Sequence, residues 1–195
     1  MLPEDLAQAE PLRARFASCA LVTDAYIACL GAHGGQDGCI LITGTGSCAQ
    51  VIAQGDSYTL GGWGLQLADQ ASGAWVGREA VRTALLAAED ILDHSPLTDQ
   101  INRQFSFSPI NYLQWSLEAK PADYAAFAPL VFQQAEQGDT HALAIVQEAA
   151  RFVTRMIRML AAAKTGRIAL LGGLAERYPA MAGGRRAQPA HPGTG

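Results

Sequence analysis

Positive charge is scarce in this sequence of 195 residues, in which 14 lysines and arginines are outnumbered by 18 aspartates and glutamates, for a net charge of −4. Proteins that bind nucleic acid need an excess of basic side chains to neutralise phosphates, so we expect no nucleic-acid partner. Long apolar runs are also lacking, since none approaches the ~18 residues of a membrane helix. The charged first residues, interrupted by Pro3 and Pro11, do not resemble a signal peptide. These absences predict a soluble cytoplasmic protein without a membrane partner.

Metal-binding spacings are missing as well. The four cysteines, Cys19, Cys29, Cys39 and Cys48, contain no CxxC pair, and the four histidines are scattered along the chain. Zinc and iron–sulfur sites are therefore not expected, and we assign no residue as a metal ligand. Each cysteine lies among apolar residues or glycine, which predicts buried free thiols in a reducing compartment.

Several common catalytic signatures are absent. The sequence has no GxxxxGK[ST] phosphate loop, no dinucleotide fingerprint leading into a helix, no GxSxG and no evident pairing of a cysteine with a histidine. Nucleophilic hydrolase chemistry therefore has little support.

Glycine, in contrast, is concentrated in one part of the chain. Of the 20 glycines, 12 fall between Gly31 and Gly77, a segment without lysine or arginine. An anion bound there must be held by backbone N–H groups, hydroxyls or a metal ion. A neutral polyhydroxylated ligand would also suit this segment.

The hydrophobic patterns predict an α/β fold with most strands in the first third and helices thereafter. Short strands are expected at residues 19–22, 39–43, 49–53, 58–60 and 167–171. Helices are expected at residues 6–16, 25–30, 72–93, 98–105, 111–117, 124–137 and 139–163. The tail from residue 177 is rich in glycine and proline and is predicted to be disordered.

Two glycine turns follow predicted strands. The turn Gly44-Thr45-Gly46-Ser47 can direct N–H groups and hydroxyls at one point, which suits a phosphate, although a hairpin turn without a ligand explains the same residues. Gly172-Gly173 ends a strand where open α/β sheets bind ligands, with a simple turn as the alternative.

Three further residues are candidates for a binding site. Asp24 is either a helix N-cap or a carboxylate directed into a cleft. Asp69 can bind a ligand hydroxyl or close an Asx turn. Trp63, between Gly62 and Gly64, suits a lid over a sugar ring better than a core anchor.

Considered together, three segments resemble the BadF/BadG/BcrA/BcrD ATPase family and, within it, the N-acetylglucosamine and glucosamine kinases. These segments are VTDAYIACLGAHGGQDGCILITGTGSCAQ, GGWGLQLADQASGAWVGREAV and RIALLGGLAE. The resemblance implies the fold of the sugar kinase, Hsp70 and actin superfamily, in which two ribonuclease-H-like lobes enclose ATP and Mg²⁺. By this resemblance residues 1–37 are a remnant of the first lobe, residues 38–176 are the second lobe with a helical segment at 72–137, and residues 177–195 are a disordered tail.

The resemblance also implies roles for single residues. Asp24 matches the carboxylate that contacts the sugar and acts as the catalytic base. ATP would contact Gly44, Thr45 and Gly46 in the second phosphate loop and Gly172 and Gly173 in the adenosine loop. The amino sugar would contact Asp24, Ser47, Cys48, Gly62, Trp63, Gly64 and Asp69.

The sequence departs from the family pattern in two respects. The usual DEGS reads Asp69-Gln70-Ala71-Ser72, which removes one acid beside the sugar. The glycine-rich DGGGT-type hairpin that holds the β- and γ-phosphates and Mg²⁺ is not found before Asp24, and the tail replaces a final helix.

We therefore expect a truncated form of an ATP-dependent amino-sugar kinase, with ATP and Mg²⁺ as cofactors and N-acetylglucosamine or glucosamine as substrate. Two alternatives remain open. One is an ATPase that activates a 2-hydroxyacyl-CoA dehydratase or benzoyl-CoA reductase, although the GGWG loop favours a sugar. The other is a non-catalytic sugar-binding module. The sequence also leaves a homodimer open.

Overall fold

Four strands form a mixed sheet in the order β3-β2-β1-β4 in this computed structural model, which describes residue 11 and residues 15–178. The strands are β1 (Gly38–Thr43), β2 (Ser47–Ala53), β3 (Asp56–Gly61) and β4 (Ile168–Leu171). The first three form an antiparallel meander, whereas β4 pairs in parallel with β1. The strands predicted at 39–43, 49–53, 58–60 and 167–171 are confirmed.

The strand predicted at residues 19–22 is wrong. The sheet does not include this segment, and Leu21 and Val22 are 40% and 38% exposed. An apolar run becomes a strand only where a neighbouring strand satisfies its backbone groups, and none of the four strands pairs with this segment. The burial expected for Cys19 is wrong for the same reason, whereas Cys29 and Cys39 are buried and Cys48 is half-buried.

The last strand is half-buried, not fully buried as predicted. Ile168 and Leu170 pack against the larger core on one face, and Ala169 and Leu171 pack against a smaller cluster on the other. Within the described residues β4 is an edge strand with a partner on one side, so its outer flank stays open.

Seven helices are described, most of them near the predicted positions. They are α2 (Asp24–His33), α3 (Gly73–Ala88), α4 (Pro96–Gln104), α5 (Pro109–Glu118), α6 (Pro121–Ala125), α7 (Ala128–Glu136) and α8 (Thr140–Ala161). The single helix predicted at 124–137 is wrong, because α6 and α7 are separate and Pro129 in the first turn of α7 has no N–H to continue a helical ladder. The helix predicted at 6–16 falls mainly outside the described residues.

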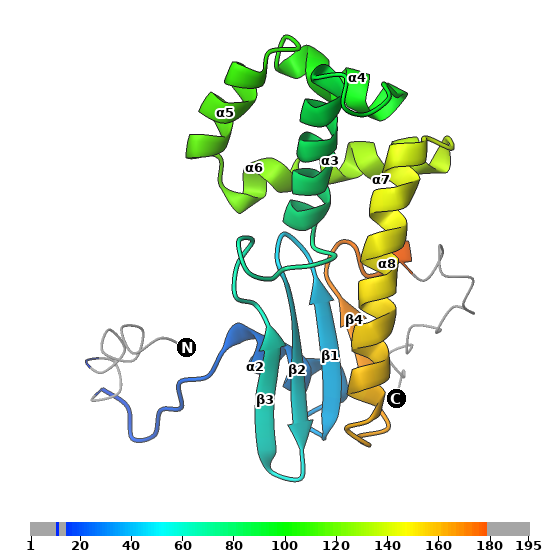
Figure 1. The fold of residues 1–195 in the computed structure, drawn as a ribbon. Helices are drawn as coiled ribbons and strands as arrows, with labels where there is room; N and C mark the ends of the chain where they lie inside the picture. Colours follow the sequence, from blue (N-terminus) through cyan, green and yellow to red (C-terminus); the bar gives the residue numbers. More distant parts are fainter. Residues whose placement is uncertain (1–10, 12–14, 179–195) are drawn as a thin grey trace, which may run out of the picture.

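Helices cover both faces of the sheet and one of its ends. Cys29 of α2 packs with Ile40 and Ile52 on one face, while α8 lies along the other face and shares the larger core with Leu41 and Val51. Figure 1 shows α3 to α7 gathered beyond the end of the sheet to which β1 points. None of the described helices combines the length and the apolar character needed to cross a membrane.

The predicted disorder is wrong for Arg177 and Tyr178, the first two residues of the tail. The Arg177 N–H donates to the Leu174 carbonyl, and Tyr178 is 2% exposed, with its ring 5.9 Å from that of Phe132. The prediction was based on the glycine-rich and proline-rich composition of the whole tail. A single aromatic residue such as Tyr178 can still bury enough apolar surface to order the residues next to it. Residues 179–195 lie outside the described part of the chain.

Candidate functional site

The two predicted glycine turns meet at one edge of the sheet. Because β1 and β4 are parallel, their carboxyl ends lie side by side, with Ile42 opposite Leu171. The Leu174 N–H donates to the Thr43 carbonyl at 3.1 Å across this junction. Gly172 has φ +96°, and a Cβ built on it would lie 2.4 Å from the Thr43 oxygen. The close approach of the two turns therefore requires a residue without a side chain at position 172.

The start of α3 is bonded to the first of these turns. The N–H groups of Gly73 and Ala74 donate to the carbonyls of Gly44 and Thr45 at 2.7 and 3.1 Å. Ser72 caps the helix by accepting from the Trp75 N–H at 3.1 Å. These bonds place the Gly44-Thr45-Gly46 turn between the sheet and α3 and leave Thr45 exposed at its tip.

Asp69 lies against the same turn. Its carboxylate is largely buried, 7% exposed, and its Oδ1 accepts from the Ser47 N–H at 3.3 Å. The Ser47 hydroxyl in turn donates to the Gln70 carbonyl at 2.8 Å. A Cβ on Gly46 would lie 3.2 Å from Asp69 Oδ2. The carboxylate therefore joins two distant segments and does not close the local Asx turn considered from the sequence.

The segment that carries Asp69 has an unusual backbone. Asp69 and Ala71 have φ values of +63° and +64°, in the left-handed region that side chains other than glycine rarely occupy. Each such residue costs on the order of 1–3 kcal/mol, and such residues persist where surrounding contacts hold them and where function needs a particular geometry.

Asp24 is not the helix cap. The cap is Thr23, whose hydroxyl accepts from the Tyr26 N–H at 3.1 Å, and Asp24 is the first residue of α2, exposed, with Oδ1 accepting from the Ala25 N–H at 2.8 Å. Burial first, and then the carboxylates of Asp24 and Asp69, raise the pKa of the half-buried Cys48 thiol. Both predicted sugar carboxylates therefore act electrostatically on one side chain.

The glycine loop after β3, Gly61 to Gly64, begins beside Ser47 and Cys48 at the start of β2. The Gly62 N–H donates to the Ser47 carbonyl at 3.0 Å, and a Cβ on Gly62 would lie 3.3 Å from the Cβ of Cys48. Gly62 and Gly64 have φ values of +73° and +83°. Trp63 between them is 73% exposed, so its indole is free to cover a ligand.

Sequence reasoning did not identify Arg78. Its guanidinium donates to the Leu65 carbonyl and pairs with Glu79 at 3.0 Å. Leu65 is buried, so this bond fixes the loop that follows Trp63 to α3. The sequence does single out Arg78, because it is the first lysine or arginine after the segment from Phe16 to Gly77, which contains neither.

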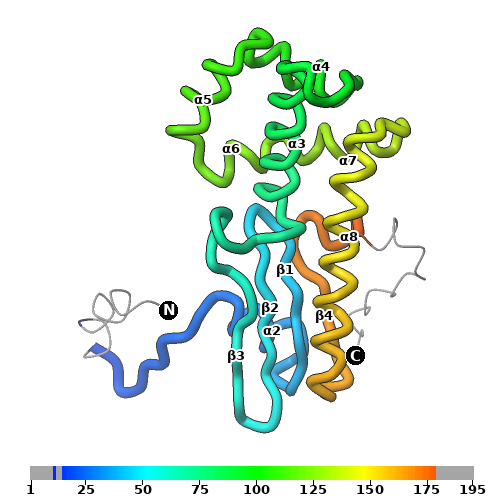
Figure 2. Tube along the Cα trace, in the orientation of Figure 1, coloured from blue at the N-terminus to red at the C-terminus, as the bar shows by residue number. Residues whose placement is uncertain are grey.

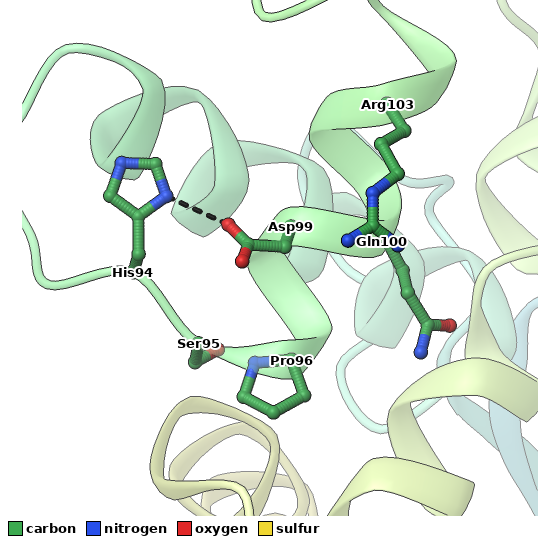
Figure 3. Close-up of a pocket in the computed structure, with 6 residues that line it drawn as sticks. All are labelled: His94, Ser95, Pro96, Asp99, Gln100 and Arg103. Carbon is green, nitrogen blue, oxygen red and sulfur yellow. Dashed lines mark hydrogen bonds and ion pairs between the residues drawn. The ribbon is translucent and has the colours of Figure 1, made fainter.

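Two hollows lie outside this edge of the sheet. One of about 410 Å³ is lined by His94, Ser95, Pro96, Asp99, Gln100 and Arg103. There His94 Nδ1 lies 2.8 Å from Asp99 Oδ1 (Figure 3), and this hydrogen bond is the main cause that raises the pKa of His94. The other, of about 490 Å³, runs along β2, β3 and the start of α2 and includes Thr23, beside Asp24. No predicted site residue lines either hollow.

The electrostatic effect of Asp24 on Cys48 can be tested by thiol alkylation. Removal of one negative charge lowers the pKa of the thiol, so more thiolate is present below that pKa. Asp24→Asn is therefore expected to speed alkylation of Cys48 by iodoacetamide at about pH 8, measured by mass spectrometry of the Cys48 peptide. Asp56→Asn, at the far end of the β2–β3 hairpin, should leave the rate unchanged. Equal rates in wild type and Asp24→Asn would contradict this electrostatic effect.

Comparisons with known proteins agree on one family. A family model for the BadF/BadG/BcrA/BcrD ATPase family matches residues 5–183. The chain is 40% identical over 162 residues to glucosamine kinase GspK of Vibrio cholerae. This alignment covers 83% of this chain and 55% of that protein. It is 32% identical over 136 residues to an N-acetylmuramic acid/N-acetylglucosamine kinase of Clostridium acetobutylicum. That alignment covers 67% of this chain and 44% of the relative.

A solved structure shows a similar fold. The crystal structure of a protein assigned as an N-acetylglucosamine kinase from Chromobacterium violaceum superposes with a TM-score of 0.80 at 33% identity. The match covers 92% of this chain and 64% of that one. The chain spans about half the length of the curated relatives it matches, 55% and 44% for the two kinases above.

Proposed function

The chain belongs to the BadF/BadG/BcrA/BcrD ATPase family, and from this we propose that it serves the ATP-dependent phosphorylation of an amino sugar, glucosamine or N-acetylglucosamine. The family resemblance and the α/β, actin-like ATPase fold class predicted from the sequence are confirmed. Residues 38–176 would form the second ATPase lobe and residues 1–37 part of the first. The observation that carries the proposal is the meeting of both glycine turns and Asp69 at one edge of the sheet.

ATP would bind at the junction of the two turns. Thr45 is exposed at the tip of the first turn, and Gly172 and Gly173 lie beside its base, so phosphate oxygens would meet N–H groups and a hydroxyl there. Among the described residues no three His, Cys, Asp or Glu side chains gather to hold a metal ion. We therefore propose that Mg²⁺ arrives with the phosphates, as is usual for this ion.

The sugar would lie near Cys48, where the predicted contacts converge. Asp69 is fixed on Ser47, and Trp63 extends from a glycine loop beside Cys48. Asp24 retains free lone pairs on an exposed carboxylate. It would accept the proton of the sugar hydroxyl while the hydroxyl oxygen bonds to the γ-phosphorus of ATP and the bond from phosphorus to ADP breaks. The role of each residue here remains a prediction.

The direct test is a phosphoryl-transfer assay. The chain is incubated with Mg·ATP and with glucosamine, N-acetylglucosamine or glucose, and formation of ADP and sugar phosphate is measured. We expect transfer to an amino sugar in preference to glucose. Binding of amino sugar without transfer would favour the non-catalytic sugar-binding module, and absence of both binding and transfer would contradict the proposal.

A substitution at Gly172 tests the nucleotide position. In Gly172→Ala the new Cβ would clash with the Thr43 carbonyl, and the residue would be strained at φ +96°, so the two turns must separate. We expect affinity for Mg·ATP, measured by calorimetry, to fall by about tenfold or more. Gly31→Ala is the matched control, because Gly31 lies in α2, outside both turns, and its Cβ meets no atom within 4 Å. Equal affinities in the two variants would contradict the assignment.

A further inference from the structure

The segment at residues 69–72 depends on contacts from outside itself. It has no regular secondary structure, and two of its residues, Asp69 and Ala71, have left-handed backbone conformations. Ala71 is fully buried, so its carbonyl oxygen requires a hydrogen-bond partner within the protein. That partner is Tyr178, whose hydroxyl donates to the Ala71 oxygen at 2.6 Å.

Tyr178 is well placed to immobilise this segment. Its side chain is 2% exposed and packs edge-on against Phe132 of α7. It follows the Gly172-Gly173 turn closely in sequence, and Leu174 between them is bonded to the Thr43 carbonyl at the end of β1. Figure 2 shows the segment after β4, in orange, turning beside the start of α3. Tyr178 therefore links the nucleotide-side turn to the segment that carries Asp69.

We propose that Tyr178 is a positioning residue, whose hydroxyl holds the Ala71 carbonyl and thereby keeps the Asp69 carboxylate on the Ser47 N–H. The bond to Ala71 lies two residues from Asp69, and Asp69 and Ala71 both occupy a conformation that the segment alone does not favour. Loss of the hydroxyl would allow the segment to relax and Asp69 to leave the turn. The consequence for sugar binding rests on the proposed function, whereas the consequence for the segment does not.

The test compares two buried tyrosines. Tyr178→Phe keeps the ring and removes the hydroxyl. Tyr112→Phe is the matched control, because Tyr112 is also 2% exposed and donates one hydrogen bond, to Asn102 Oδ1 at 2.7 Å, within the helical part of the chain. Hydrogen exchange of the whole chain is measured for the Ser47 amide and for residues 69–72. We expect exchange to rise about tenfold in Tyr178→Phe and to stay at the wild-type rate in Tyr112→Phe.

The second readout is the binding of N-acetylglucosamine and glucosamine, measured by titration. We expect Tyr178→Phe to bind sugar about fivefold more weakly, with unchanged affinity for Mg·ATP, and Tyr112→Phe to bind as wild type does. Unchanged exchange at 69–72 in Tyr178→Phe, or an equal rise in both variants, overturns the proposal. So does failure of Tyr178→Phe alone to fold, or faster exchange with unchanged sugar affinity. If wild type binds no sugar, the proposed function fails, and exchange still decides whether Tyr178 positions Asp69.

Discussion

Replacing Asp24 by asparagine is expected to lower the turnover of amino-sugar phosphorylation by about 10²–10⁴-fold, the usual contribution of a general base. The amide keeps the shape of the side chain and can still accept a hydrogen bond from the sugar hydroxyl, but it cannot take up the proton. Sugar affinity should therefore change little. The measurement is steady-state kinetics with Mg·ATP and glucosamine or N-acetylglucosamine, with wild type as the reference.

Asp69→Asn provides the comparison. Asp69 is largely buried and bonded to Ser47, so it is expected to orient the sugar and not to take the proton. Its replacement should raise KM more than it lowers kcat, the reverse of the effect at Asp24. Near-normal turnover in Asp24→Asn would mean that Asp24 is only a first-turn residue of α2, and the assignment of the base would be wrong.

The second large effect is expected at Gly77, where α3 meets the end of α6. A Cβ at this position would lie 1.7 Å from the Tyr124 oxygen and 2.6 Å from its carbonyl carbon. Because both are backbone atoms, no rotamer change relieves the clash, and the two helices must separate. We expect Gly77→Ala to lose about 3 kcal/mol of stability and to melt roughly 10 °C lower, as measured by calorimetry or circular dichroism.

Gly31→Ala is the matched control for this prediction. Gly31 also lies in a helix, α2, but a Cβ there meets no atom within 4 Å. Since alanine favours a helix over glycine by about 1 kcal/mol, this variant should melt at the wild-type temperature or slightly above it. Equal melting temperatures for Gly77→Ala and Gly31→Ala would contradict the explanation that close packing of α3 against α6 requires glycine at position 77.

Most secondary structure could be predicted because its causes are local. The β1–β2 hairpin follows from two apolar runs around a glycine turn, and α8 follows from apolar residues recurring every three to four positions. One error arose where a neighbour decides the outcome, because residues 19–22 are apolar but lie outside the sheet. The other, a single helix across residues 124–137, overlooked a local signal, because Pro129 lies in the first turn of the separate helix α7.

The candidate site shows the same division. The amino-acid sequence by itself determined which residues carry the family motifs, because the glycines, Thr45 and Asp69 are recognised by their order and spacing. Only the tertiary structure decided which of them meet. Parallel pairing of β1 with β4 places Gly172 against Thr43, and the bond from Tyr178 to Ala71 joins segments far apart in the chain. Such contacts depend on how strands pair and helices pack across the whole fold, and local composition and periodicity carry no record of that arrangement.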